Sequence, residues 1–194
     1  MVPETLPRNQ AARRSRVIDA AMALAAEGGY DAVQMRDVAA GANVALGTIY
    51  RYFTSKDQLL AAAMVEWLGQ LEREVGQRPA RGETAADRVV DVVQRASRTL
   101  ERNPRLTAAL LTAVSAPDPD VVALHRQSSA AMQRILSASM ADLDEETKGN
   151  VVRVLNHVWF SALLAWVNGW TDAGQVSEEL EVAGRLVLRA DVPG

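Results

Sequence analysis

The sequence predicts an all-α protein, and three observations lead to that prediction. Apolar residues recur at spacings of three and four along most of the chain, which is the period of a helix with one buried face. Ser, Thr, Asp and Asn, which cap helix N-termini, precede several of these periodic segments. No stretch alternates apolar and polar residues as a half-buried strand would, so we expect about nine helices and no sheet.

The composition is that of an ordinary globular protein. The chain has 194 residues, 48% of them hydrophobic and 23% charged, which is enough for one domain or for a small domain and a larger one. No window approaches the roughly 18 uncharged apolar residues that span a membrane, and no apolar signal segment is visible, so we expect a cytoplasmic protein. The lack of cysteine excludes disulfides, thiolate metal sites and cysteine nucleophiles.

The first expected helix covers residues 9–26. Val17, Ala21 and Leu24 form its apolar stripe, and Gly28-Gly29 ends it. Four arginines lie at the start of this helix, namely Arg8, Arg13, Arg14 and Arg16. They make the local charge positive in a chain whose net charge is −3, so they either contact a phosphate backbone or form a solvated helix face.

Residues 35–53 predict two short helices joined by a tight turn. The first helix covers residues 35–40, Gly41-Ala42-Asn43 forms the turn, and the second helix covers residues 45–52. Val44 and Ile49 can face inward in this arrangement, which leaves hydroxyl and guanidinium groups free. This is the layout of a helix-turn-helix, whose second helix contacts phosphates and base edges of DNA.

A glycine, Gly47, lies inside the second of these helices. There it costs ~1 kcal/mol relative to alanine, so we expect a steric reason for its presence. The backbone at this position either approaches DNA closely or packs closely against another helix.

Six further helices are expected after residue 53, each from its own start signal. The signals are Ser55 with Gln58, Thr84 with Asp87, Asn103-Pro104, Asp118-Pro119, Asp144 and Ser177. The helix after Asp144 would cover residues 145–172, and the last helix would end at about Arg189.

Residues 145–172 carry apolar side chains around most of the helix circumference. Such a helix must be buried on both sides, either at the centre of a single-chain core or across the two-fold axis of a dimer. We expect a homodimer in which this helix and the last one form the interface. The interface residues would be Val151, Leu155, Val158, Ala162, Leu180, Ala183, Gly184 and Val187.

The N-terminal three-helix unit, the segment VALGTIYRYFTSKDQLL and the all-helical remainder together resemble the TetR family of bacterial transcriptional repressors. The resemblance implies a helix-turn-helix DNA-binding domain over residues 1–54 and a helical ligand-binding and dimerisation domain over residues 55–194. It also implies a double-stranded DNA operator and a small-molecule effector as partners.

Eight residues are candidates for DNA contact. Gln34, Arg36, Thr48, Tyr50, Tyr52 and Lys56 occupy positions that contact DNA in members of the family, and the layout of the second helix adds Gly47 and Arg51. Arg36 and Thr48 can reach base edges, whereas the other four family positions suit phosphate oxygens. The sequence departs from the family at Ala45, where serine is common, so the second helix lacks a capping hydroxyl.

Large apolar residues of the C-terminal helices are candidates for the wall of a lipophilic pocket. They are Trp67, Leu106, Leu110, Met132, Trp159 and Trp166. The chain also resembles one subgroup of the family, the repressors that control cholesterol catabolism in actinobacteria. The segments that carry this resemblance are GGYDAVQMRDVA, ERNPRLTAAL and HVWFSALLAW. That resemblance implies a sterol-derived acid or an acyl-CoA as the effector.

Sequence signals for an enzyme are lacking. His125 and His157 lie on different expected helices without metal-binding spacing, and neither a phosphate-binding loop nor a nucleophile-elbow motif occurs. We therefore expect no enzyme, no catalytic residue, no metal and no cofactor.

The expected function is a ligand-responsive repressor that a lipophilic molecule releases from a pseudo-palindromic operator. The alternative is a ligand-independent dimeric DNA-binding protein with a regulatory or architectural role.

Overall fold

The computed structural model describes residues 8–188, and this part of the chain folds into nine α-helices without a strand. The helices are α1 (Arg8–Ala32), α2 (Met35–Gly41), α3 (Leu46–Tyr50), α4 (Lys56–Gln77), α5 (Ala85–Glu101), α6 (Pro104–Val114), α7 (Pro119–Ala138), α8 (Glu145–Val167) and α9 (Ala173–Leu188). The all-α prediction is confirmed for these residues. None of these helices is both long enough and apolar enough to cross a membrane.

Local hydrogen bonds explain where most helices begin, because a capping side chain satisfies backbone N–H groups that lack a partner in the first turn. At α5 the cap is reciprocal between Thr84 and Asp87. The other predicted caps that accept a backbone N–H bond are Ser55, Asn103, Asp118 and Asp144. The predicted starts of these five helices are therefore confirmed.

α1 runs six residues beyond its expected end at residue 26, and α3 is shorter than the expected residues 45–52. Two boundaries in the C-terminal part of the chain also differ from the prediction. α9 begins at Ala173, where the Gln175 side chain accepts a bond from the Asp172 N–H at 2.9 Å, so Ser177 lies inside the helix and is not its cap. α8 ends at Val167 because Gly169, with a φ of 72°, adopts the left-handed conformation that follows many helices. The predicted end of the last helix, Arg189, lies outside the described residues.

Two hydrophobic clusters form the core. The first cluster joins α1, α2 and α3 to the first half of α4 and to α6, and it includes Ile18, Ile49 and Leu110. The second cluster joins the second half of α4 to α5, α7, α8 and α9, and it includes Ile135 and Leu180. α4 belongs to both clusters. The predicted division of the chain at residue 54 falls directly before this shared helix and remains a prediction.

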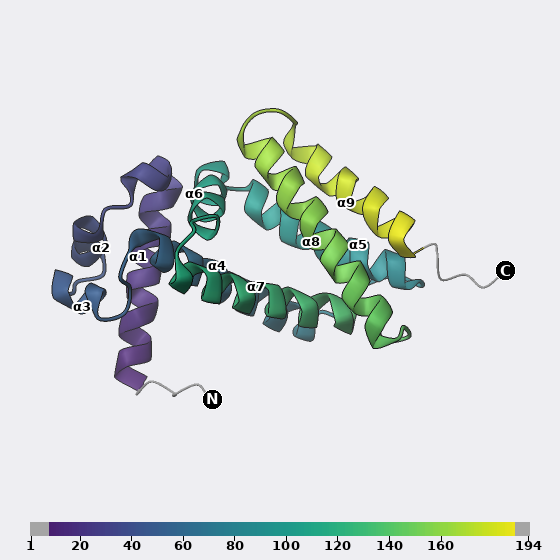
Figure 1. Ribbon diagram of the computed structural model, residues 1–194, viewed down its shortest axis with the longest axis horizontal. Coiled ribbons are helices and arrows are strands. Elements are labelled where there is room, and N and C mark those ends of the chain that lie inside the picture. Colours follow the sequence, from purple (N-terminus) through teal and green to yellow (C-terminus); the bar gives the residue numbers. More distant parts are fainter. Residues whose placement is uncertain (1–7, 189–194) are drawn as a thin grey trace.

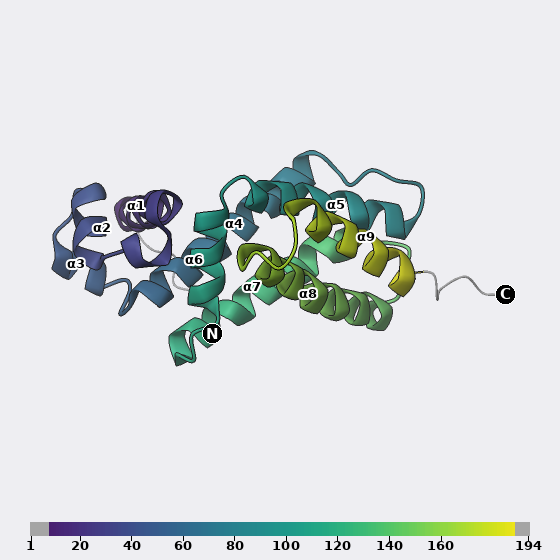
Figure 2. The same ribbon diagram turned by 90° about the horizontal axis from the view of Figure 1, so that it is seen from above.

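The described part of the molecule is elongated, with α1, α2 and α3 at one end (Figure 1). α6 packs against α1, and α4 packs along α7, so these helices connect that end to the rest. α8 and α9 run antiparallel on the other side of the molecule (Figure 1), and α9 lies beside α5 when the molecule is seen from above (Figure 2).

α8 and α9 each bury one face inside their own chain. Val151, Leu155 and Ala162 of α8 are at most 2% exposed, and Leu180 and Gly184 of α9 are buried as well. A Cβ at Gly184 would lie 3.4 Å from a methyl group of Val90 on α5, so this glycine faces α5 of its own chain. Because these five residues are buried within a single chain, they offer no exposed surface to a second copy, and their place in a dimer interface stays a prediction. The other three, Val158, Ala183 and Val187, are half-buried against the second cluster.

Candidate DNA-binding surface and ligand pocket

The turn between α2 and α3 depends on Asn43, whose φ of 52° is a left-handed conformation that asparagine adopts more readily than most residues. The Val44 N–H donates to the Ala39 carbonyl oxygen at 3.0 Å and closes the turn. Val38 and Ile49 are fully buried and anchor the two helices on the first cluster. The predicted helix pair therefore forms, although α3 has only five residues.

The candidate DNA-contacting residues lie on or beside α2 and α3, apart from Lys56, which begins α4. Five of them are exposed, namely Gln34, Arg36, Gly47, Tyr50 and Arg51, and three are half-buried, namely Thr48, Tyr52 and Lys56. The structure brings Gln34 and Arg36 of α2 together with Tyr50 of α3 around one hollow. Tyr50 is 51% exposed, which leaves a large aromatic side chain available to a partner. The contacts of these residues with DNA remain predictions.

Gly47 has no steric role inside the chain. A Cβ built at this position meets nothing within 4 Å, so the interpretation that Gly47 allows helix packing is wrong. The other interpretation, close approach of the backbone to DNA, remains. The preceding residue Ala45 is the N-cap of α3 and makes no side-chain hydrogen bond there, as expected from its lack of a hydroxyl.

Two residues near this surface stabilise the fold. Tyr52 packs partly against the first cluster, with its ring centroid 6.4 Å from that of Phe53. Arg14 forms an ion pair with Glu66 of α4, and its guanidinium lies 5.3 Å from the centroid of the Phe53 ring. Arg14 therefore joins α1 to α4 and is not part of a free helix face, whereas Arg16 is exposed.

Tyr30 links the end of α1 to the start of α4. It follows Gly29, whose φ of 73° and ψ of −164° interrupt α1 at the predicted Gly28-Gly29 stop. The Tyr30 hydroxyl donates to the Asp57 carboxylate. The Lys56 ammonium lies 3.7 Å from the centroid of the Tyr30 ring and donates to the Tyr30 carbonyl oxygen at 3.3 Å. Burial and the bond to Asp57 raise the pKa of Tyr30 to about 12.

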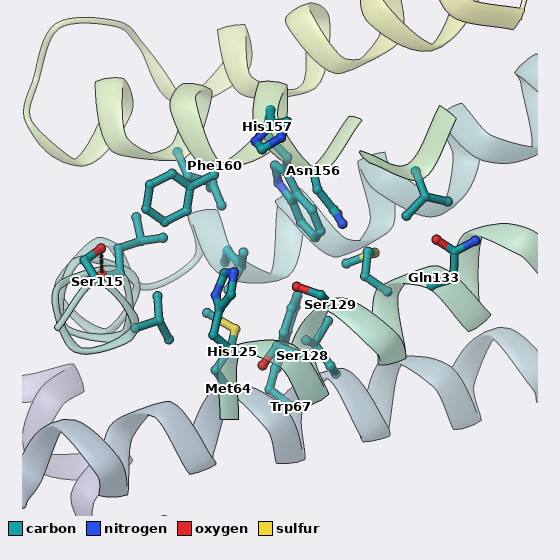
Figure 3. Close-up of a pocket in the computed structure, with 18 of the residues that line it drawn as sticks. Met64, Trp67, Ser115, His125, Ser128, Ser129, Gln133, Asn156, His157 and Phe160 are labelled. Atoms are coloured by element: carbon teal, nitrogen blue, oxygen red, sulfur yellow. Dashed lines mark hydrogen bonds between the residues drawn. The ribbon is translucent and has the colours of Figure 1, made fainter. Parts of the chain in front are cut away.

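A cavity of about 520 Å³ lies between α4, α5, α6, α7 and α8 (Figure 3). Of the six predicted pocket residues, Trp67, Met132 and Trp159 line it. The rings of Trp67 and Trp159 lie 6.4 Å apart and are inclined by 53°, and they form part of an apolar wall. Cavities of roughly 300–1,000 Å³ with such walls are typical of small-molecule sites.

The other three predicted ligand-binding residues, Leu106, Leu110 and Trp166, do not line this cavity. Leu106 and Leu110 pack in the first cluster, and Trp166 packs against the second. Leu111, the neighbour of Leu110, does line the cavity. Successive residues of a helix point about 100° apart, so the two neighbours face different clusters.

α7 and α8 also contribute polar residues to the cavity wall, which the sequence pattern did not predict. His125, Ser129 and Gln133 recur every fourth residue of α7, and Asn156 and His157 extend from α8 on the opposite side of the cavity (Figure 3). Both histidines of the chain therefore line the same cavity. Polar residues one turn apart on an amphipathic helix are the signal that indicates such a wall.

Two polar atoms of the cavity walls have no partner among the described residues. They are Ser128 Oγ and Trp159 Nε1, and both are buried. An unsatisfied buried donor or acceptor costs about 1–3 kcal/mol, so a ligand that supplies a partner gains that energy. The lining contains Arg153 and no carboxylate, which favours an anionic or neutral ligand over a cationic one.

α6 lies between the cavity and α1, and α1 in turn packs against α2. Leu111 and Val114 of α6 line the cavity, whereas Leu110 is buried in the first cluster with α1 and α3. The Arg105 guanidinium of α6 also donates to the Glu27 carbonyl oxygen of α1 at 2.6 Å. A displacement of α6 therefore acts directly on α1.

Exposed apolar side chains gather on α8, α9 and the loop between them. Apart from Phe160, which also lines the cavity, they are Val154, Leu164, Trp170, Val182 and Leu186. Trp170 is 72% exposed, and Val182 and Leu186 are one turn apart on the same face of α9. Exposed apolar surface of this kind marks an interaction site. These five exposed residues are therefore interface candidates as well.

Comparison with known proteins identifies the family. Residues 17–63 match bacterial regulatory proteins of the tetR family, and residues 82–187 match the tetracyclin repressor-like C-terminal domain. The chain is 37% identical over 180 residues to the HTH-type transcriptional repressor KstR of Mycobacterium tuberculosis, which covers 92% of this chain and 82% of the relative.

Solved structures agree with this match. A TetR transcriptional regulator from Rhodococcus sp. RHA1 has a TM-score of 0.82 at 30% identity, over 96% of this chain and 100% of that one. Thermus thermophilus FadR, solved in complex with lauroyl-CoA, has a TM-score of 0.74 at 22% identity, over 93% of this chain and 96% of that one, and shares the fold. The chain thus belongs to the TetR family of bacterial regulatory proteins, as its helix-turn-helix and all-helical remainder predict.

Proposed function

We propose that the protein is a homodimeric transcriptional repressor that binds a pseudo-palindromic operator in the cytoplasm and leaves it when a lipophilic molecule fills the cavity. The observation that carries the proposal is the position of α6. Its Leu111 lines the cavity, while the adjacent Leu110 is buried in the cluster that anchors the helix-turn-helix. A ligand therefore cannot displace this helix without affecting α1.

The DNA-binding part of the proposal is supported by the exposed surface of α2 and α3. Arg36 and Thr48 would contact base edges, and Gln34, Tyr50, Tyr52 and Lys56 would contact phosphates. Gly47 and Arg51 complete this surface, since Gly47 has open space where a Cβ would be. The relative KstR is named as a helix-turn-helix repressor, which supports repression as the output.

The effector is a lipophilic molecule with hydrogen-bonding or anionic groups. The apolar wall with Trp67 and Trp159 suits the body of such a molecule, and the polar wall with Asn156 and His157 suits its oxygens. A sterol-derived acid and an acyl-CoA both have this chemistry. The lauroyl-CoA complex of the structurally similar FadR supports the acyl-CoA class.

Dimerisation would use the exposed apolar side chains of α8, α9 and their loop. A two-fold interface brings the same surface of two copies together, so Val182 and Leu186 would pack against the partner's α8 and α9. The dimer would place two copies of α3 in major grooves about one or more helical turns (~34 Å each) apart. The ligand would stabilise a geometry in which the two copies of α3 no longer match these grooves.

Fluorescence anisotropy and thermal shift together test the proposal. The protein should prefer the intergenic DNA upstream of its own gene to random duplex of equal length, with an affinity that falls steeply with salt. A panel of fatty acyl, steroid and aromatic compounds should contain one that raises the melting temperature by mass action and releases that DNA.

Equal affinity for specific and random DNA would overturn the repressor assignment. Specific DNA binding that no bound compound reduces would instead support the ligand-independent regulatory or architectural protein.

A further inference from the structure

The Lys56 side chain is held in place before any DNA is bound. Its ammonium lies 3.7 Å from the centroid of the Tyr30 ring, a distance typical of a cation–π contact, and donates to the Tyr30 carbonyl oxygen at 3.3 Å. A lysine ammonium has three donors, so this bond leaves others for a phosphate. Lys56 is half-buried at the first position of α4, where a free lysine side chain would otherwise sample many rotamers.

Tyr30 is itself held at both ends. Its hydroxyl donates to the Asp57 carboxylate of α4, and its backbone follows the left-handed Gly29 that breaks α1. The hydroxyl is protonated at neutral pH and remains a donor, and burial and the bond to Asp57 raise its pKa further, to about 12. The ring position is therefore determined by contacts with α4, the same helix that carries Lys56.

We propose that Tyr30 is a positioning residue for DNA binding, because its ring and carbonyl group hold the Lys56 ammonium where it meets a phosphate of the operator. The inference rests on the proposed function, and it adds a residue that would not touch DNA itself. Preorganisation of this kind reduces the entropy lost when the lysine is immobilised on the phosphate.

A double-mutant cycle on operator affinity tests the inference. K56M removes the phosphate contact and should weaken binding about 10-fold, and it should reduce the slope of log affinity against log salt by about 1. Y30L should weaken binding about 3-fold, because Lys56 loses the ring but can still reach the phosphate. Y30L should have no further effect in the K56M background, since Tyr30 acts through Lys56. Y30F keeps the ring face and should retain nearly the full affinity.

Two outcomes of this cycle overturn the inference. Additive losses from Y30L and K56M would show that Tyr30 acts on the fold alone, and an unchanged affinity and salt slope in K56M would show that Lys56 makes no phosphate contact. If K56M is unchanged but the wild-type protein still prefers its operator to random DNA, only this inference is wrong and the proposed function is unaffected. R98M, which removes an exposed cation on α5, should change neither quantity and serves as the matched control.

A measurement on the wild-type protein covers the case in which Y30L fails to fold. Nuclear magnetic resonance should find the ε-methylene signal of Lys56 shifted upfield by the Tyr30 ring current in the free dimer. The shift should persist in the operator complex. Its loss on DNA binding would show that Lys56 leaves Tyr30 when it contacts DNA, and would overturn the inference.

Discussion

The helix-turn-helix surface and the ligand cavity place their candidate functional residues in opposite environments. On the surface, Val38 and Ile49 are fully buried and stabilise the fold, while Arg36 and Tyr50 are exposed and make no part of the core. In the cavity, Trp159 is only 6% exposed and belongs both to the lining and to the second cluster. Function and stability are therefore separable at exposed surface residues such as Arg36 and Tyr50, and coupled in the cavity at Trp159.

The largest effect is expected from charges on the exposed apolar face of α9. The double variant V182E/L186E should be monomeric and should lose about 10²- to 10⁴-fold in operator affinity, because a dimer gains that much by binding two half-sites at once. Light scattering and fluorescence anisotropy measure the two quantities. E74K, which reverses an exposed charge on α4, away from α8 and α9, is the control. A dimeric V182E/L186E protein would contradict the assignment of this face.

Removal of a cavity tryptophan should affect stability and ligand binding together. W159A should lower the free energy of unfolding by about 3–5 kcal/mol, as for other large-to-small changes in a core, and should weaken effector binding. W166A changes the same residue type outside the cavity and should leave effector affinity unchanged. Denaturant unfolding and ligand titration distinguish the two variants. If W159A and W166A lost ligand affinity equally, the ligand would not bind in the cavity that Trp159 lines.

Removal of a surface arginine should affect only recognition. R36A should relax base preference at one operator position by about 1–3 kcal/mol, while the free energy of unfolding changes by no more than about 0.5 kcal/mol. Y50A should instead weaken binding to all sequences alike, because a phosphate contact carries no base preference. Affinities for a set of single-base operator variants check both. A uniform loss in R36A would show that Arg36 contacts a phosphate.

The smallest effect is expected from a substitution at Ser128, and it tests whether stability and ligand binding depend on the same cavity residue. Its hydroxyl is buried and unsatisfied, so S128A should stabilise the free protein by about 1 kcal/mol. The same change should weaken binding of an effector that bonds to this hydroxyl. T99A, which removes an exposed hydroxyl on α5, is the control. A free protein destabilised by S128A would indicate that the hydroxyl has a partner.

The sequence predicted best those features that depend on nearby residues. The caps at Ser55, Thr84 and Asp144 are hydrogen bonds between residues three apart, so the pattern determines them directly. The helix-turn-helix likewise depends on spacing within one short stretch. Ser177 failed as a cap because a better local arrangement, with Gln175 closing on Asp172, lies just before it.

Features that depend on distant helices could not be predicted. Leu110 and Leu111 are the same residue type side by side, and only the positions of α1 and α7 decide which one faces the cavity. On α8, apolar residues surround the helix, so the pattern could not distinguish the buried Val151 and Leu155 from the exposed Val154. Nothing in the sequence shows that α7 and α8 face each other across a cavity, so the sequence could not predict that His125 and His157 line it together.

The central claim is that α6 couples the cavity to the DNA-binding surface, and one measurement tests it most directly. Operator affinity is measured by fluorescence anisotropy with and without a saturating compound that raises the melting temperature. Ligand affinity is then measured with and without the operator. The account predicts that the ligand weakens operator binding at least about 10-fold, and that the operator weakens ligand binding by the same factor, because coupling between two sites is reciprocal. A ligand that binds in the cavity and leaves operator affinity unchanged would contradict it.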